Sequence, residues 1–329
     1  CTCLVDDLDA VMGIVGDVLR APAFPEAEVE VRRAEIVTMI RQDDDNPAVL
    51  AAEGLMTLLY GDAHPFGWRP RGTVESLARL GRHDLQAFHA ARLRPGCLSV
   101  AVVGDVSPDR AVSAVESVLG EWQAEAPAPL LLEPPVQPTS RRVRVVEMMN
   151  KVQTDIAYGF PAIRRDAPEY YAAWLMNNIL GEYAIGGRLG DSIRERQGMA
   201  YYVFSGLDAS VIPGPLLIRA GVSPANVDRT IQSIDEELTR MVAEGPTEQE
   251  FTESRQFLIG SLPRRLETNA SIAAFLQTVE FFGLGLDYHR RVPELLGRVT
   301  LDEVRAVARQ LLDPARASIV VAGPYRAPA

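Results

Sequence analysis

The sequence is short of cysteine and of positive charge. Its 329 residues include three cysteines, and 33 basic against 44 acidic side chains give a net charge of −11. Three cysteines exclude a disulfide scaffold, so we expect Cys1, Cys3 and Cys97 to be small buried hydrophobic residues. The lack of a basic stripe argues against a nucleic-acid partner, because phosphate backbones are bound largely by cationic side chains.

The apolar runs are also too brief to cross a bilayer. The longest, such as "AAWLMNNIL" and "CLSVAVVG", fall well short of the roughly 20 residues that a transmembrane helix needs. The chain has no initiator methionine or signal peptide and opens on "CTCLVDDLD", which reads as the end of a strand entering a helix. We therefore expect a fragment or a processed chain, without a membrane span, from a soluble protein.

The chain does contain an internal repeat. "RPGCLSVAVVGDV" and "DPARASIVVAGPY" align without a gap at an offset of 219 residues, which pairs Pro95 with Pro314 and Gly104 with Gly323. Upstream, "DLQAFHAARL" and "EVRAVARQLL" align at the same offset. Each copy reads as a helix, a proline turn, a buried β-branched strand and a glycine. A repeat this long indicates duplicated domains, since solenoid units have only about 20–50 residues.

A proline-rich stretch separates the two copies. Residues 126–140, "APAPLLLEPPVQPTS", predict a linker, because proline breaks helices and cannot donate to a β-ladder. We expect residues 1–125 to form the rear part of a first lobe and residues 141–329 a complete second lobe. Within the first, "NPAVLAAEGLMTLLYG" predicts a helix with Asn46 as its N-cap and Gly61 as its stop.

Four stretches, in this order and spacing, carry a family resemblance across nearly the whole chain. They are "FPEAEVEVRRAEIVTMIRQDDDNPAVLAAEGLMTLLYGDAHPFG", "CLSVAVVGDVSPD", "VQTDIAYGFPA" and "GGRLGDSIRERQGMAYYVFSG". Together they resemble the pitrilysin/insulinase family of zinc peptidases, the inverzincins. The resemblance implies an α+β fold of duplicated lobes, each a mostly antiparallel sheet with helices packed on one face, the first lobe being incomplete. It also implies a bacterial protein of the cytoplasm or periplasm.

The zinc motif of that family is not found in this sequence. Active members carry H-x-x-E-H on a helix, and "HDLQAFH" has no glutamate between its histidines. The resemblance places a further zinc-ligand glutamate at Met39 and its acidic partner at Arg32, so both positions have lost their carboxylates. Glu35, one turn before Met39, is a possible substitute ligand. The histidines, which we expect to be solvated or locally bonded, are His64, His83, His89 and His289.

An arginine and a tyrosine seven residues apart match a second feature of the family. By resemblance, Arg194 and Tyr201 are the pair that hydrogen-bonds a substrate carbonyl near the scissile bond and stabilises the developing oxyanion. Gly198 is expected to end the helix and to allow the turn into the strand that carries Tyr201. In the alternative interpretation, Arg194 is a helix C-terminal cation and Tyr201 a core aromatic residue.

Three hypotheses follow. In the first, the second lobe binds a peptide or unfolded polypeptide and completes the zinc site of a homologous subunit, a homodimer being the other expected assembly, and the chain alone is non-catalytic. In the second, the chain is the C-terminal portion of a complete zinc endopeptidase whose zinc motif lies upstream. In the third, it is a scaffold subunit with a relic site. "VQTDIAYGFPA" and the strand near "CLSVAVVG" are both candidates for a free sheet edge that a peptide could join, and the sequence does not show which edge is open.

Overall fold

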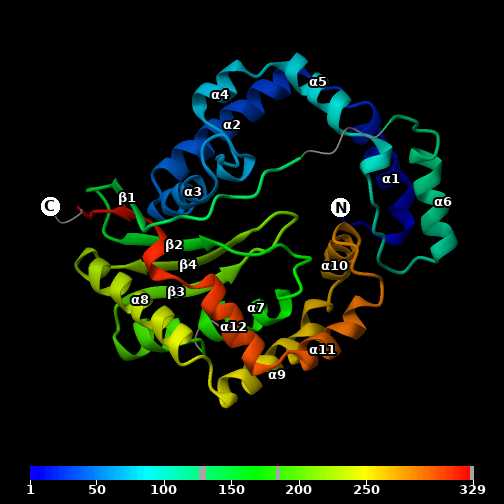
Figure 1. The fold of residues 1–329 in the computed structure, drawn as a ribbon. Helices are drawn as coiled ribbons and strands as arrows, with labels where there is room; N and C mark the ends of the chain where they lie inside the picture. The colour runs from blue at the N-terminus through cyan, green and yellow to red at the C-terminus, as the bar shows by residue number, and fades with distance from the viewer. Residues whose placement is uncertain (126–130, 183–185, 327–329) are drawn as a thin grey trace. The chain divides into compact units, whose positions relative to one another are not determined.

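The computed structural model describes residues 1–125, 131–182 and 186–326. They form two compact units, each of which can be followed along the chain in Figure 1. Unit 1 consists of Cys1–Met39, Thr73–Leu131 and Ser261–His289, and unit 2 of Ile40–Gly72, Leu132–Gly260 and Arg290–Ala329. Each unit draws segments from both sides of the predicted linker, and the division into lobes stays a prediction.

The linker itself is described only in part. Residues 126–130 lie outside the described residues, and residues 131–140 carry neither helix nor strand. Among the residues that the structure does describe, none of the helices combines the length and the apolar character that crossing a membrane requires.

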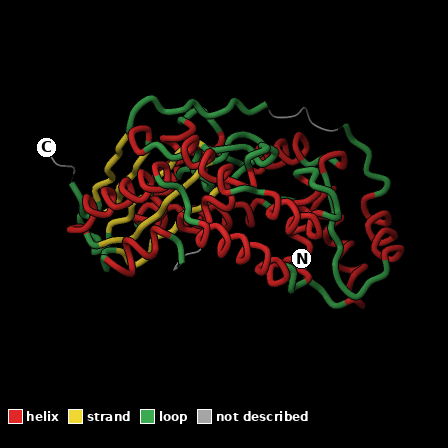
Figure 2. Tube along the Cα trace, turned by 60° about the horizontal axis from the view of Figure 1, so that its bottom comes forward, coloured by secondary structure: helices red, strands yellow, loops and turns green. Residues whose placement is uncertain are grey.

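Five strands of unit 2 form one mixed sheet, in the order β1-β5-β2-β4-β3, drawn in yellow in Figure 2. β1 and β5 run parallel, and the other neighbours pair antiparallel. This confirms the predicted α+β class with a mostly antiparallel sheet. The strands are β1 (Arg142–Glu147), β2 (Thr154–Pro161), β3 (Ala200–Leu207), β4 (Pro215–Val222) and β5 (Ser318–Gly323).

Helices cover both faces of this sheet, not one face as expected, because the helix Pro47–Tyr60, from before the linker, packs on the second face. Leu55 of α3 packs in one apolar cluster with Ala157 of β2. Tyr158, which follows Ala157 and so points to the opposite face, donates a 2.8 Å hydrogen bond to Asp235 of α8. α12 packs against both α7 and α8. The helices that lie wholly in unit 2 are α3 (Pro47–Tyr60), α7 (Tyr170–Asn177), α8 (Val227–Ala243) and α12 (Leu301–Leu311).

α3 begins and ends where its sequence predicts. The Asn46 side chain accepts a 3.0 Å hydrogen bond from the Ala48 amide, which satisfies one of the free donors at the helix start. Gly61 ends the helix with φ of 85°, a backbone region that other residues rarely adopt. Both predicted capping residues are therefore confirmed.

Helices recur along the chain at the offset of the sequence repeat. α1 and α8 begin at equivalent positions, and α5 and α12 match at both ends. Gly104 and Gly323, paired in the alignment, have φ of 155° and 143°. The remaining helices are α1 (Leu8–Arg20), α2 (Glu26–Asp44), α4 (Val74–Arg79), α5 (Arg82–Arg92), α6 (Pro108–Leu119), α9 (Glu248–Arg265), α10 (Asn269–Phe281) and α11 (Tyr288–Arg298).

The repeat fails at one element. "CLSVAVVG" was predicted to be a buried strand, but residues 98–103 are extended without strand pairing and Val100 is 49% exposed. The described residues of unit 1 contain no strand for this segment to pair with. A strand exists through its ladder, so the prediction was wrong because the sequence pattern does not report whether partners are present.

The cysteine prediction was also wrong. Cys1, Cys3 and Cys97 are all exposed free thiols. Cys97 ends a short 3-10 turn, Pro95–Cys97, ahead of the unpaired segment. It is exposed because no sheet among the described residues of unit 1 covers it.

Candidate functional site

Arg194 and Tyr201 lie in a stretch of unit 2 whose helical parts are π-helical. η4 (Asn178–Glu182) and η5 (Gly190–Arg196) flank the glycine-rich turn, and β3 follows directly. π-Helical turns are rare and frequently occur at functional sites. The unusual backbone therefore falls on the segment that the sequence singles out.

Glycines allow this segment to lie close to β3. A Cβ atom on Gly181 would approach the backbone nitrogen of Ser205 to 2.9 Å. One on Gly187 would approach the Cα of Gly181 to 2.8 Å. Real Cβ atoms are essentially never found at such distances, so a side chain at Gly181 would push the segment away from β3, and one at Gly187 would push it away from Gly181.

Arg194 occupies the last turn of η5 with an exposed side chain. Its neighbours Ser192 and Ile193 are buried, whereas 44% of the Arg194 side chain is exposed and its nearest ionic partner is Glu195 at 3.6 Å. Gly198 ends the helix: its φ is 62°, and its amide donates to the Arg194 carbonyl at 3.1 Å. The glycine stop that the sequence predicts is confirmed.

Tyr201 is the extra residue of a β-bulge. Ala200 pairs with Val222 and Tyr202 with Gly221, which leaves Tyr201 without a partner in β4. Bulges re-aim a side chain relative to the regular alternation of a strand, and Tyr201 is 66% exposed. The interpretation of Tyr201 as a core aromatic residue is therefore wrong. Arg194 does lie at a helix C-terminus, so its alternative role is compatible with the structure.

β3 is an edge strand of the described sheet, and β2 is not. "VQTDIAYGFPA" was expected to offer a free edge, but β2 pairs with β4 on one side and with β5 on the other. All eight residues of β2 are buried, as in a central strand. That expectation was wrong. The edge strands are β1 and β3, and Tyr201 lies at the start of β3.

Beneath the start of β3, Tyr202 points to a buried carboxylate. The Tyr202 hydroxyl donates to Asp155 of β2, which is only 3% exposed and also accepts from Gln153 at 3.1 Å. Burial, together with the neighbouring Asp155 carboxylate, raises the pKa of Tyr202 far above its usual value. Tyr202 is thus a permanent donor that ties the bulged strand to β2.

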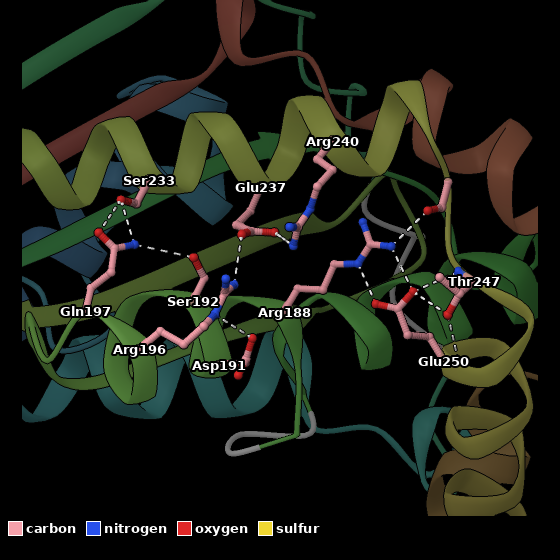
Figure 3. A network of polar contacts seen from close by, with 11 residues as sticks. Arg188, Asp191, Ser192, Arg196, Gln197, Ser233, Glu237, Arg240, Thr247 and Glu250 are labelled. Atoms are coloured by element: carbon pink, nitrogen blue, oxygen red, sulfur yellow. Dashed lines mark hydrogen bonds and ion pairs between the residues drawn. The ribbon is translucent and has the colours of Figure 1, made fainter.

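A partly buried ion pair, in which Arg188 is the buried partner, fixes the start of the segment. The Arg188 guanidinium, on a side chain 7% exposed, meets the Glu250 carboxylate at 2.6 Å, with a second bond from Nη2 at 2.8 Å. Burial alone would raise the pKa of Glu250, but hydrogen bonds from Arg188 and Thr247 lower it to about 2. Figure 3 shows these contacts on the right of the network.

This ion pair was not predicted from the sequence, although Glu250 lies in a recognisable sequence pattern. Thr247 and Glu250 form a reciprocal capping box at the start of α9, with amide-to-side-chain distances of 2.7 and 3.1 Å. The pattern T-x-x-E predicts that box from sequence alone. It does not predict that Arg188, 62 residues earlier, binds the same carboxylate.

The end of the segment is tied to α8. Arg196 contacts Asp191 at 2.9 Å and Glu237 of α8 at 3.8 Å. Gln197 donates to Ser233 of α8 at 3.1 Å. These contacts appear along the left and centre of Figure 3.

The residues proposed for a metal do not form a metal site. Glu35 accepts a 2.8 Å hydrogen bond from Arg32 on the same helix, so its carboxylate faces a guanidinium, and Met39 offers only a thioether. Within residues 1–125, 131–182 and 186–326, no group of three or more His, Cys, Asp or Glu side chains could hold an ion. The donors present therefore do not fit zinc, which needs three protein ligands.

Two of the four histidines are bonded to backbone carbonyls. His64 Nε2 lies 3.1 Å from the Glu133 carbonyl, and His89 Nε2 lies 2.9 Å from that of Leu19. Neither ring is aimed at a carboxylate or a second histidine by these contacts. The predicted local bonding is confirmed for His64, whose Nδ1 also accepts from the Phe66 amide at 3.0 Å, whereas the partner of His89 lies 70 residues earlier in the chain.

Comparison with known proteins gives the family. An uncharacterized zinc protease of Mycobacterium leprae is 29% identical over 329 residues, covering 98% of this chain and 72% of that protein. A non-peptidase homologue of Helicobacter pylori is 22% identical over 290 residues, covering 88% of this chain and 66% of that protein.

A solved structure agrees with these relatives. The crystal structure of a peptidase M16 inactive domain from Pseudomonas fluorescens superposes with a TM-score of 0.89 at 28% identity, over 99% of this chain and 77% of that one. The family model described as the Peptidase M16 inactive domain matches residues 79–258, more than half of the chain and including the whole segment that bears Arg194 and Tyr201. The chain belongs to the peptidase M16 inactive-domain family.

Proposed function

We propose that this chain binds extended polypeptide through Arg194 and Tyr201, completes the peptide site of a zinc-carrying subunit, and does not hydrolyse peptides alone. One observation carries the proposal. The Arg194 guanidinium and the Tyr201 phenol lie on either side of the Gly198 turn, where η5 leads into the edge strand β3. The Arg194 side chain is 44% exposed and Tyr201 is 66% exposed. Both would be accessible to a ligand.

A peptide carbonyl is the acceptor that these two groups share. Arginine presents a fork of N–H donors, and tyrosine a single O–H donor. Preorganised donors stabilise the negative charge that grows on a carbonyl oxygen during acyl transfer, and removing one typically costs about 2.7–4 kcal/mol. The role of this chain is thus to bind and polarise a carbonyl, not to supply the nucleophile.

The partner would supply the metal. The described part of this chain lacks a zinc donor set, and its family is that of the M16 inactive domain. A subunit of the same ancestry is the natural source of both zinc and the activated water. A second copy of this chain is the other candidate for the interface.

Hydrolysis of a quenched fluorescent peptide tests the proposal, with this chain mixed with a zinc-carrying M16 subunit. We expect Arg194→Ala and Tyr201→Phe each to lower the rate about 100-fold. Arg298→Ala and Tyr325→Phe are matched controls: the Arg298 side chain is 72% exposed, and Tyr325 hydrogen-bonds Asp228 on the surface. Rates unchanged by Arg194→Ala and Tyr201→Phe would favour the scaffold hypothesis.

A second candidate function is the C-terminal portion of a complete zinc endopeptidase. The observation in its favour is the length of the relatives: this chain spans 72% and 73% of the first two, both named zinc proteases. The coding sequence on either side of this stretch tests it, since an H-x-x-E-H motif there would support the second candidate. One tightly bound zinc per purified chain, measured by metal analysis, would contradict the first.

A further inference from the structure

The segment that carries Arg194 is held at both ends by buried or half-buried polar contacts. Its start is held by Arg188, which is bidentate to Glu250 and also donates to the Gly245 carbonyl at 2.8 Å. Its end is held by Gln197 on Ser233 at 3.1 Å. Between these points Arg194 itself is exposed.

These contacts are spread along one helix and the turn that follows it. Ser233 and Glu237 are four residues apart and so lie on the same side of α8, and Gly245 comes just after that helix ends. Figure 3 shows Arg196 and Gln197 directed toward α8, where they contact Glu237 and Ser233, whereas Arg188 is directed toward Glu250. The rotation of η5 about its axis is therefore set by α8 and the first turn of α9.

Arg188 is the residue of this network whose charge is buried and therefore depends on its partner. Its side chain is 7% exposed, and among the residues that the structure describes no acceptor lies within hydrogen-bond distance of its Nη1. A buried guanidinium needs its counter-charge, and breaking such a pair by removing one partner is strongly destabilising. Bidentate pairing also fixes the plane of the guanidinium, which a single hydrogen bond does not.

We propose that the Arg188–Glu250 ion pair is the positioning device of the peptide site: it sets the orientation in which η5 and the bulge present Arg194 and Tyr201. Neither Arg188 nor Glu250 contacts the ligand in this proposal. This inference rests on the proposed function for its consequence, but the position of Tyr201 can be measured without any ligand.

The test uses the full chain containing 3-fluorotyrosine, read by ¹⁹F NMR, with the Tyr201→Phe variant assigning one of the nine tyrosine resonances. Binding is measured in parallel as the anisotropy of a fluorescein-labelled, unstructured synthetic peptide. We expect Glu250→Gln to broaden or double the Tyr201 resonance and to weaken binding about 10-fold. Glu294→Gln, which breaks an exposed ion pair with Arg298, should leave both readouts unchanged.

A double variant separates positioning from simple stability. Arg188→Gln with Glu250→Gln removes both charges, so no unpaired ion is left inside and the thermal unfolding temperature should largely recover. The bidentate geometry is still lost, so the resonance should stay perturbed and binding weak. If Glu250→Gln alone fails to fold, the double variant serves as the test. Gln197→Ala, at the other end of the segment, is then measured beside it, and we expect it to weaken peptide binding about threefold.

An unperturbed Tyr201 resonance in the double variant would overturn the inference. If binding also recovered together with the unfolding temperature, the ion pair would serve stability alone. Failure of the proposed function is distinguishable: Arg194→Ala would leave peptide binding unchanged, whereas the Tyr201 resonance would still respond to Glu250→Gln.

Discussion

The two copies of the repeated element have similar apolar sequences and opposite environments. Residues 318–323, "SIVVAG", form β5, whose six residues are all buried between β1 and β2. Residues 99–104, "SVAVVG", occupy the equivalent place in the first copy and form no strand. The helix and the proline turn before them are conserved in both copies. Local sequence therefore specifies the helix, and the neighbouring strands decide whether the segment after it becomes a strand.

The largest expected effect comes from placing a charge at matched positions of the two copies. Ile319 is fully buried and Val100 is 49% exposed. We expect Ile319→Asp to lower the free energy of unfolding by more than about 4 kcal/mol, because it buries an unpaired carboxylate. Val100→Asp should change it by at most about 0.5 kcal/mol. Urea unfolding followed by circular dichroism measures both, and equal losses would remove the contrast between the copies.

A smaller effect is expected at the glycine that closes each copy. Gly104 and Gly323 share a positive φ, so alanine strains the backbone at both positions by roughly 1–2 kcal/mol. At Gly323 the new Cβ would also meet the Thr154 Cα at 2.7 Å, whereas at Gly104 the nearest atom is 3.7 Å away on Asn269. We expect Gly323→Ala to be the more destabilising by a further 1–3 kcal/mol or so in urea unfolding. A difference near zero would mean that the two glycines are equivalent.

The last expected effect concerns the loss of stability in acid. The pKa of Glu250 is about 2 in the folded protein against 4.5 in a free side chain. A lowered carboxyl pKa contributes stability that is fully present above about pH 4.5 and is lost as the pH falls toward 2, on the order of 2–3 kcal/mol in total. Glu250→Gln should therefore flatten the fall in stability between those pH values.

The matched control for that titration lies in unit 1. The pKa of Glu30 is also lowered, by its hydrogen bond from Arg33, but Glu30 is on the surface, where ion pairs contribute little. Chemical denaturation at a series of pH values should show no flattening for Glu30→Gln. Flattening of equal size in both variants would argue against a special role for the buried pair.

Much of the fold and part of the site could be predicted from the sequence. The Asn46 cap, the Gly61 and Gly198 stops and the repeat depend on local backbone chemistry, which a sequence records directly. The Arg188–Glu250 pair joins residues 62 positions apart, and the Tyr201 bulge depends on the register between two strands. Contacts of that kind are set by tertiary packing, so no local sequence pattern predicts them.

Residues 98–103, which form no strand, show the same limit of prediction from local sequence. The apolar run in "CLSVAVVG" predicts a buried strand as strongly as that in "ASIVVAG". Only the presence of β1 and β2 beside residues 318–323 distinguishes them. A sequence pattern therefore predicts what a segment can become, not whether its partners are there.

The central claim is that Arg194 and Tyr201 both donate hydrogen bonds to one peptide carbonyl oxygen. A crystal structure of the chain, with a zinc-carrying M16 subunit and an uncleaved peptide bound, tests it most directly. The account predicts that the Arg194 guanidinium and the Tyr201 hydroxyl both lie within hydrogen-bonding distance of the same carbonyl oxygen. A peptide bound elsewhere, with these two side chains facing apart, would contradict it.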